Sequence, residues 1–120
     1  MRTLLTLLSL AFAATLTLAG CSSPAPVTVG EDAVIIDVRT PAEYAEGHLD
    51  GAVNIDVSSP AFADTIAELP ADDEYVVYCR SGNRSAQAAS IMRDHGFEHV
   101  IDAGALSDAS TATGIDIVTE

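Results

Sequence analysis

Residues 34–43 read VIIDVRTPAE, and this stretch gives the strongest indication of the fold class. Residues 34–38 form a continuous apolar run with one acid, which is typical of a strand buried on both faces. Thr40 then offers a side chain that can cap a helix, Pro41 suits the first helical position, and Glu43 places an acid in the first turn. A buried strand that leads directly into a helix predicts an α/β protein.

The same alternation of strand and helix continues along the chain. Gly47 would end the first helix, and Gly96 would end a later one. We expect further strands at residues 52–55, 75–78 and 100–101, and further helices at residues 60–69, 85–95 and 105–113. This order predicts a central parallel sheet of about five strands with helices on both faces.

The first twenty residues carry one positive charge, no acid and a run of apolar and small hydroxyl residues. This composition is typical of a secretory signal. The segment ends in Leu18-Ala19-Gly20-Cys21, which resembles the lipobox of bacterial lipoproteins. The resemblance implies that Cys21 carries lipid, palmitate included, and anchors the protein to the extracytoplasmic side of the cell membrane. The alternatives are an ordinary cleaved signal with an accidental cysteine and, less favoured because the apolar run is short, an uncleaved membrane anchor.

The rest of the chain is long enough for one domain and too short for two. We assign residues 1–20 to the signal, residues 21–28 to the lipidated cysteine and a flexible proline-containing linker, and residues 29–120 to the folded domain. Without the signal, four arginines and no lysine stand against 18 acids, a formal charge of −14. Such a surface repels nucleic acid and anionic headgroups, so attachment to the membrane would depend on the acyl chains. We expect a monomer.

One cysteine, Cys79, directly follows the predicted strand at residues 75–78 and opens the segment CRSGNRS. A disulfide to Cys21 is the competing interpretation, and it is disfavoured because Cys21 lies in the linker. Ligands of open α/β sheets collect where strands end and loops lead into helices. Main-chain N–H groups of a curled loop, for which Gly82 allows a positive φ, would favour the ionised sulfur. We expect a thiolate that is exposed enough to react.

The segment Cys79-Arg80-Ser81-Gly82-Asn83-Arg84-Ser85 is similar to the active-site loop of single-domain rhodaneses. Two upstream blocks strengthen the resemblance: residues 37–44, DVRTPAEY, and residues 47–55, GHLDGAVNI. The blocks stand in the family's order and cover nearly all of residues 29–118. The sequence therefore resembles a rhodanese-like domain carried on a lipoprotein signal.

The resemblance implies a sulfurtransferase. Cys79 would attack the outer sulfur of thiosulfate or of a persulfide donor, and the Cys79 persulfide would pass its terminal sulfur to a thiol or to cyanide. The substrate-binding group would be Arg80, Ser81, Gly82, Asn83, Arg84 and Ser85, with Arg84 binding the anionic donor first and Arg80 second. No cofactor and no metal are expected, since no histidine or cysteine has metal-ligand spacing. The second hypothesis is a persulfide carrier or binding module at the membrane surface, without appreciable turnover.

Cysteine phosphatases and the related arsenate reductases use a larger loop, with five residues between cysteine and arginine. Four residues separate Cys79 from Arg84, so sulfur chemistry is favoured over phosphate or redox chemistry. Asp37 and Arg39 are interpreted as a structural ion pair near the site. His48 is interpreted as a hydrogen-bonded cap on its loop, because a thiolate stabilised by dipoles needs no base. The two remaining histidines, residues 95 and 99, are expected at the surface.

The chain departs from the family near its C-terminus. Many relatives have Gly-Gly and then a helix with tryptophan, whereas this chain reads Asp102-Ala103-Gly104-Ala105-Leu106 and contains no tryptophan. The closing helix then buries less apolar surface than an aromatic residue would provide. We expect lower stability and a more open rim around the site.

Overall fold

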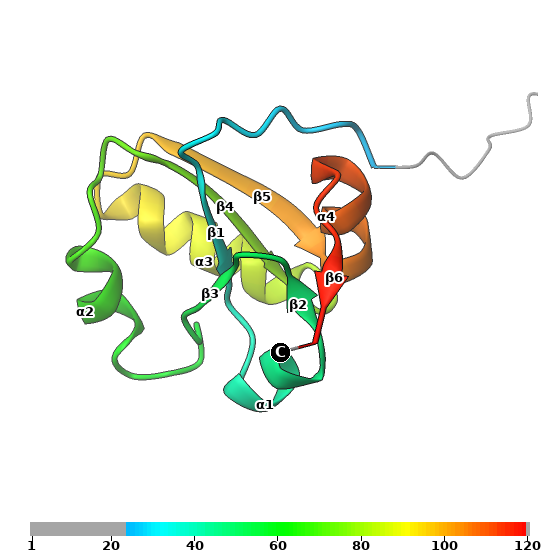
Figure 1. The fold of residues 1–120 in the computed structure, drawn as a ribbon. Coiled ribbons are helices and arrows are strands. Elements are labelled where there is room, and N and C mark those ends of the chain that lie inside the picture. Colours follow the sequence, from blue (N-terminus) through cyan, green and yellow to red (C-terminus); the bar gives the residue numbers. More distant parts are fainter. Residues whose placement is uncertain (1–23, 120) are drawn as a thin grey trace, which may run out of the picture.

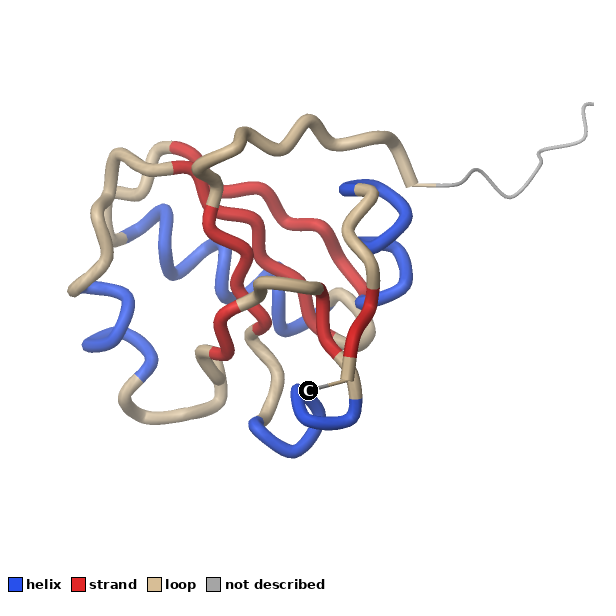
Figure 2. The backbone as a smooth tube through the Cα atoms, in the orientation of Figure 1, coloured by secondary structure: helices blue, strands red, loops and turns tan. Residues whose placement is uncertain are grey.

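Four parallel strands form the centre of the fold in the computed structural model, which describes residues 24–119. Helices surround these strands, and a small pair of strands lies near the C-terminus (Figures 1 and 2). The elements, in chain order, are β1 (Val34–Asp37), α1 (Pro41–Glu46), β2 (His48–Leu49), β3 (Val53–Asn54), α2 (Phe62–Ala67), β4 (Glu74–Cys79), α3 (Asn83–Asp94), β5 (His99–Ala105), α4 (Leu106–Thr113) and β6 (Ile117–Val118).

The main sheet has the strand order β3-β1-β4-β5, and every neighbouring pair in it is parallel. The predicted α/β class with a central parallel sheet is therefore confirmed, with four strands in place of the expected number of about five. β2 and β6 form a separate antiparallel pair, in which His48 lies opposite Val118. The sequence did not predict this pair, because two-residue strands show no periodicity.

Helices cover both faces of the sheet, as predicted. Along β4, Tyr75, Val77 and Cys79 point to one face, while Val76 and Tyr78 point to the other. The first face packs against α2 and α3 through Phe62, Ile66, Ala88, Ala89 and Met92. The second face packs against α4, β2 and α1 through Ala109, Leu49 and Tyr44. Two apolar layers thus enclose the strand that ends in the cysteine.

Helix α1 starts as the sequence predicted. The Thr40 side chain accepts a hydrogen bond from the Glu43 N–H, and the Glu43 carboxylate accepts one from the Thr40 N–H. This reciprocal pair satisfies two donors that the start of a helix leaves free. Pro41 occupies the first helical position, and Gly47 ends the helix. Helix α2 is shorter than expected, and α3 begins at Asn83, two residues before the predicted start.

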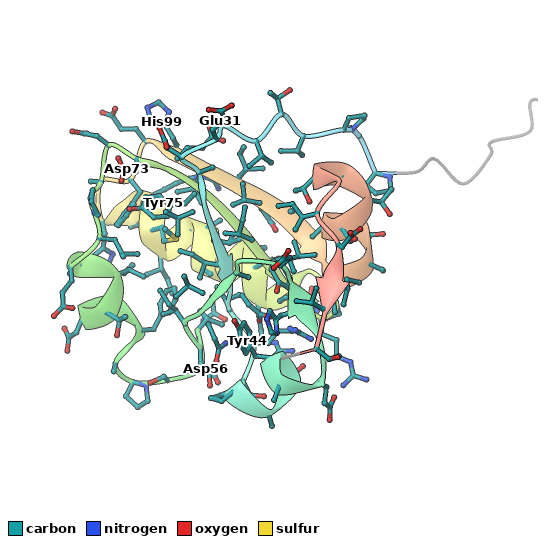
Figure 3. The ribbon with its side chains drawn as sticks, viewed as in Figure 1. Glu31, Tyr44, Asp56, Asp73, Tyr75 and His99 are labelled. Carbon is teal, nitrogen blue, oxygen red and sulfur yellow. The ribbon has the colours of Figure 1, made fainter. Side chains whose placement is uncertain are left out.

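Figure 3 shows residues at the two ends of the parallel strands. Tyr44 and Asp56 lie at the end where α1 is found, whereas Asp73 and His99 lie at the opposite end, where β4 and β5 begin. His95 and His99 are both exposed, as the sequence predicted. The proposed signal at residues 1–20 and the proposed lipid site at Cys21 lie outside the described residues. Between residues 24 and 119, no helix is long and apolar enough to cross a membrane.

Candidate active site

The candidate nucleophile, Cys79, is the last residue of β4 and carries a free thiol. Its position in the alternation of β4 turns the side chain toward α3, among Val38, Ala88 and Ala89 of one core layer. The side chain is fully buried, with 0% exposure. The expectation of an exposed sulfur is therefore wrong, because the loop after β4 brings the Gly82 N–H and the Ser85 hydroxyl to the sulfur and core side chains enclose it.

A turn of three residues brings main-chain N–H groups to the sulfur. The Gly82 N–H donates to Cys79 Sγ over 2.9 Å, and the Ser85 Oγ lies 3.5 Å from the same sulfur. Gly82 reaches this geometry with φ +99°, a left-handed conformation that residues with a Cβ rarely adopt. The predicted role of Gly82 in curling the loop agrees with this geometry.

The pKa of the Cys79 thiol reflects two opposing causes. Burial alone would raise it, since an apolar surrounding disfavours the charged sulfur. Hydrogen bonds from the Ser85 hydroxyl, and from the main-chain N–H groups of Ser85, Gly82 and Ser81, lower it. The net result is a pKa below that of an ordinary thiol. The arrangement thus favours a thiolate in a site that excludes water.

Ser85 has a hydroxyl that can serve either state of the sulfur. With a neutral thiol, Cys79 Sγ donates to Ser85 Oγ, which itself donates to the Gly82 carbonyl over 3.0 Å. When the sulfur ionises, the Ser85 proton can turn toward it instead. The Gly82 carbonyl then keeps a hydrogen bond from the Ala86 N–H at 3.2 Å. Ionisation therefore leaves no buried group unpaired.

The two arginines of the loop differ in their surroundings. Arg84 donates to both carboxylate oxygens of Glu43, over 2.7 and 2.8 Å, and the two side chains are 29% and 18% exposed. Arg80 is exposed and forms no ion pair within residues 24–119. The ion pair counts against the prediction that Arg84 binds an anionic donor before Arg80 does. Of the two loop arginines, Arg80 is the one whose guanidinium group has no ionic partner in the part of the chain that the structure describes.

A cavity of about 250 Å³ lies beside the loop. Arg80 contributes to its wall, as do the C-terminal part of α1, the first residue of α4 and the first residue of β6. The lining residues are Arg39, Glu43, Glu46, Gly47, Arg80, Leu106 and Ile117. Cys79 is not among them, which agrees with its burial. A reactant in this cavity would reach the sulfur only after residues 80–84 move.

Asp37 and Arg39 form the predicted ion pair, and both are buried. The Arg39 guanidinium also donates to the Gly47 carbonyl over 2.6 Å, while the Tyr78 hydroxyl donates to Asp37 over 2.7 Å. Tyr78 in turn accepts a hydrogen bond from the Leu49 N–H. All partners in this network are satisfied from within the protein, which fits a scaffold that joins β1, β4 and β2.

His48 follows the same pattern. Its Nδ1 lies 2.9 Å from the Tyr44 carbonyl, its ring stacks on the Tyr44 ring at 3.7 Å, and the residue is buried. No hydrogen bond joins His48 to Cys79 within the described residues, in agreement with the interpretation of His48 as a cap rather than a base.

The remaining residues of the loop make few contacts. Ser81 and Asn83 are exposed, and Asn83 is the first residue of α3.

The sequence had singled out neither Tyr78 nor Glu46 as part of the site. Glu43 was noted for its position in the first turn of α1 and as part of the block at residues 37–44, and not as a partner of the loop. A partner for Arg84 could have been sought among acids at helix starts, but the sequence alone did not say which one.

The chain is similar in sequence to a known protein family and to several of its members. Residues 28–104 match the family model described as a rhodanese-like domain. The chain is 38% identical over 73 residues to the thiosulfate sulfurtransferase PspE of Escherichia coli, a match that covers 61% of this chain and 70% of that protein. It is 36% identical over 72 residues to a sulfurtransferase of Allochromatium vinosum, covering 60% of this chain and 65% of that protein.

Solved structures give the same picture. A rhodanese with anions from Escherichia coli superposes with a TM-score of 0.62 at 33% sequence identity, covering 73% of this chain and 99% of that one. A rhodanese-like domain from Anabaena, solved in solution, gives a TM-score of 0.63 at 27% identity and covers 74% of this chain and 67% of that one. The arrangement of the four-stranded sheet and its helices is thus that of these structures.

Proposed function

The chain belongs to the rhodanese-like domain family, and from this premise we propose that it transfers sulfane sulfur from thiosulfate or a persulfide donor to a thiophilic acceptor through a persulfide on Cys79. Its sulfurtransferase relatives support rhodanese-type sulfur transfer in general. The observation that carries the finer proposal is the environment of Cys79, a free thiol that accepts a hydrogen bond from the Gly82 N–H and whose pKa is lowered by Ser85 and by the N–H groups of its own loop.

The chemistry would take two displacements. The Cys79 thiolate attacks the outer sulfur of thiosulfate, the sulfur–sulfur bond breaks, and sulfite leaves with the electron pair. An acceptor thiolate then attacks the terminal sulfur of the persulfide, and Cys79 leaves as a thiolate. The thiolate carries its charge on Cys79 Sγ, and the persulfide carries it on the terminal sulfur bonded to Sγ, so the N–H donors of the loop can stabilise both states.

Reaction at a buried sulfur requires the loop to open. Cys79 is buried, Gly82 of the loop contacts its sulfur, and the Arg84–Glu43 ion pair holds the end of that loop against α1. Arg80 has no such partner among residues 24–119, so we assign it the first contact with an anionic donor. Arg84 would join only when Glu43 releases it. The engagement of Arg84 also argues against phosphate chemistry, in which the loop arginine must hold the oxyanion.

A carrier without rapid turnover is the second candidate, and the full burial of Cys79 favours it. A covered persulfide would be protected from small thiols until a partner opened the loop. Both candidates predict that thiosulfate or polysulfide adds sulfur to Cys79.

The test is intact mass spectrometry of residues 22–120, which lack Cys21, after loading, with Cys79→Ser as the control. We expect a gain of one sulfur atom in the parent protein and none in Cys79→Ser. Subsequent discharge to a small thiol within seconds would favour the enzyme, and a persulfide that persists for hours would favour the carrier. Equal loading of both proteins would overturn the assignment of Cys79.

We further propose that Cys21 is acylated and holds the domain at the extracytoplasmic face of the cell membrane. The support is the sequence Leu18-Ala19-Gly20-Cys21 behind a signal-like segment. Radiolabelled palmitate should enter the full chain and not Cys21→Ser when both are expressed in a bacterium. Label in both variants, or in neither, would refute the anchor and leave the sulfur chemistry untouched.

A further inference from the structure

The cavity beside Arg80 contains four charged side chains, and two of them are already paired. Arg39 is bound to Asp37 and to the Gly47 carbonyl, and Glu43 is bound to Arg84. Arg80 and Glu46 have no hydrogen-bonding or ionic partner within residues 24–119, and both are exposed. The same cavity is therefore lined by one cation and one anion that have no partner among the described residues.

The remaining wall of the cavity is largely aliphatic. Leu106 is half-buried at the start of α4, and Ile117 on β6 is 45% exposed, one of two large apolar side chains with such exposure in the described chain. The volume of about 250 Å³ lies below the range of about 300–1,000 Å³ for sites that take drug-sized ligands. The cavity thus suits a small molecule with a short aliphatic portion.

The charge of the whole protein adds a second constraint. A formal charge of −14 without the signal opposes the approach of a dianion such as thiosulfate. A zwitterion has no net charge and is not repelled. Its two ends can still be recognised locally, because Arg80 can bind a carboxylate through two parallel hydrogen bonds and Glu46 can accept from an ammonium group.

On the basis of the sulfurtransferase function proposed above, we infer that this cavity selects a zwitterionic aminothiol as the acceptor. In the complex, the carboxylate binds Arg80, the ammonium group faces Glu46, and the carbon chain lies against Leu106 and Ile117. The acceptor thiol first loses its proton to water. After residues 80–84 have moved, with Arg80 still bound to the carboxylate, its thiolate attacks the terminal sulfur of the Cys79 persulfide, the sulfur–sulfur bond breaks, and Cys79 leaves as a thiolate, so that the acceptor becomes the persulfide.

The test is single-turnover discharge of protein loaded beforehand with polysulfide, so that binding of the donor does not enter the measurement. Four acceptor thiols differ in the charge of the group at the other end of the molecule. L-cysteine is a zwitterion, cysteamine a cation, 3-mercaptopropionate an anion, and 2-mercaptoethanol carries no charge. The proteins are the parent, Arg80→Gln and Glu46→Gln. Dividing each parent rate by the rate of a variant with the same thiol cancels the intrinsic reactivity of that thiol.

We expect Arg80→Gln to slow discharge to L-cysteine and 3-mercaptopropionate about three- to five-fold, because a partly exposed ion pair changes a binding constant by roughly this factor. The rates with cysteamine and 2-mercaptoethanol should not change. Glu46→Gln should slow L-cysteine and cysteamine by a similar factor and leave the other two unchanged. Glu98 and Arg93 lie outside the cavity, so Glu98→Gln and Arg93→Gln are controls for the loss of one charge. Any change that they cause should be the same for all four thiols.

The inference is overturned if the two cavity variants slow all four thiols alike or slow none of them. Failure of the proposed function itself would give a different result. The parent protein would then gain no sulfur on Cys79, or would pass it to none of the four thiols within hours.

Discussion

Glu43 and Arg84 lie 41 residues apart in the chain and meet through two hydrogen bonds, of 2.7 and 2.8 Å. Glu43 also closes the capping box of α1, and Arg84 lies in the first turn of α3. One carboxylate therefore joins the starts of the two helices on either side of the Cys79 loop. This hydrogen bonding with Arg84 is the main cause that lowers the pKa of Glu43 to about 2.

Replacing Glu43 by Gln should lower the free energy of unfolding by about 1 kcal/mol at pH 7, since the ion pair is partly exposed and screened by water. The pKa of the carboxyl is depressed in the folded protein, so its stabilising effect is complete above the ordinary pKa of 4.5 and is lost as pH falls toward 2. The difference in unfolding free energy between the parent and Glu43→Gln, measured by urea denaturation, should therefore shrink as the pH falls from 4.5 to 2.

The matched control is Glu98→Gln, an exposed acid without a hydrogen-bond partner among the described residues. It should change the stability by less than about 0.5 kcal/mol at either pH. A Glu43→Gln protein whose deficit stays constant from pH 7 to pH 2 would contradict the ion pair as its cause.

Ser85→Ala should raise the pKa of Cys79, because it removes the hydroxyl that contributes most among the hydrogen bonds lowering that pKa. A higher pKa means less thiolate at neutral pH, so the midpoint of the pH dependence of iodoacetamide alkylation should move upward. Alkylation should be slow in all variants, since the sulfur is buried. The midpoint is nevertheless defined by ionisation alone.

Ser81→Ala is the control for this measurement. Ser81 lowers the pKa of Cys79 through its main-chain N–H only, and its side chain is exposed. The substitution should leave the alkylation midpoint where it is. A midpoint that moves equally in both variants would assign the effect to the shape of the loop instead of to the Ser85 hydroxyl.

Local patterns in the sequence predicted local structure well. Thr40, Pro41 and Glu43 form the predicted helix start, because capping involves residues only three positions apart. Gly82 has the predicted positive φ, since a tight turn between a strand and a helix leaves few alternatives. The α/β class was likewise predicted, because buried strands and helices differ in length and periodicity.

Features that depend on distant parts of the chain were not predicted. The partner of Arg84 is an acid on α1, whereas the resemblance had implied that Arg84 binds an anionic donor. The sulfur was expected to be exposed, but its burial depends on how residues 80–85 pack against the end of β4. The lining of the cavity by Glu46, Leu106 and Ile117 combines α1, α4 and β6, whose meeting only the folded chain defines.

Tyr78→Phe should destabilise the protein by about 1–3 kcal/mol, because it leaves buried groups without partners. The Tyr78 hydroxyl donates to Asp37 and accepts from the Leu49 N–H, and both partners are fully buried. Burial first, and then the hydrogen bond to Asp37, raise the pKa of this phenol, so it stays protonated as a donor. Chemical denaturation at pH 7 measures the loss.

Tyr75→Phe provides the comparison. Its ring is equally buried, but its hydroxyl makes one partly buried hydrogen bond, to the Pro70 carbonyl over 2.7 Å, and water can replace that donor. We expect a loss of about 1 kcal/mol or less. If Tyr75→Phe cost as much as Tyr78→Phe, the network around Asp37 would not be the source of the larger effect.

Gly82→Ala separates the strain of the loop from the chemistry of the sulfur. At φ +99° an alanine is strained by about 1–2 kcal/mol, although a Cβ there would meet only the Gly104 Cα, at 4.0 Å. Gly96 has a similar φ of +89° with open space around it, and it lies beyond the far end of α3. Gly82→Ala and Gly96→Ala should therefore lose similar amounts of unfolding free energy.

Only Gly82→Ala should also raise the alkylation midpoint of Cys79, because relief of the strain turns the Gly82 N–H away from the sulfur that it contacts at 2.9 Å. Equal midpoints in the two variants would show that this N–H does not hold the thiolate.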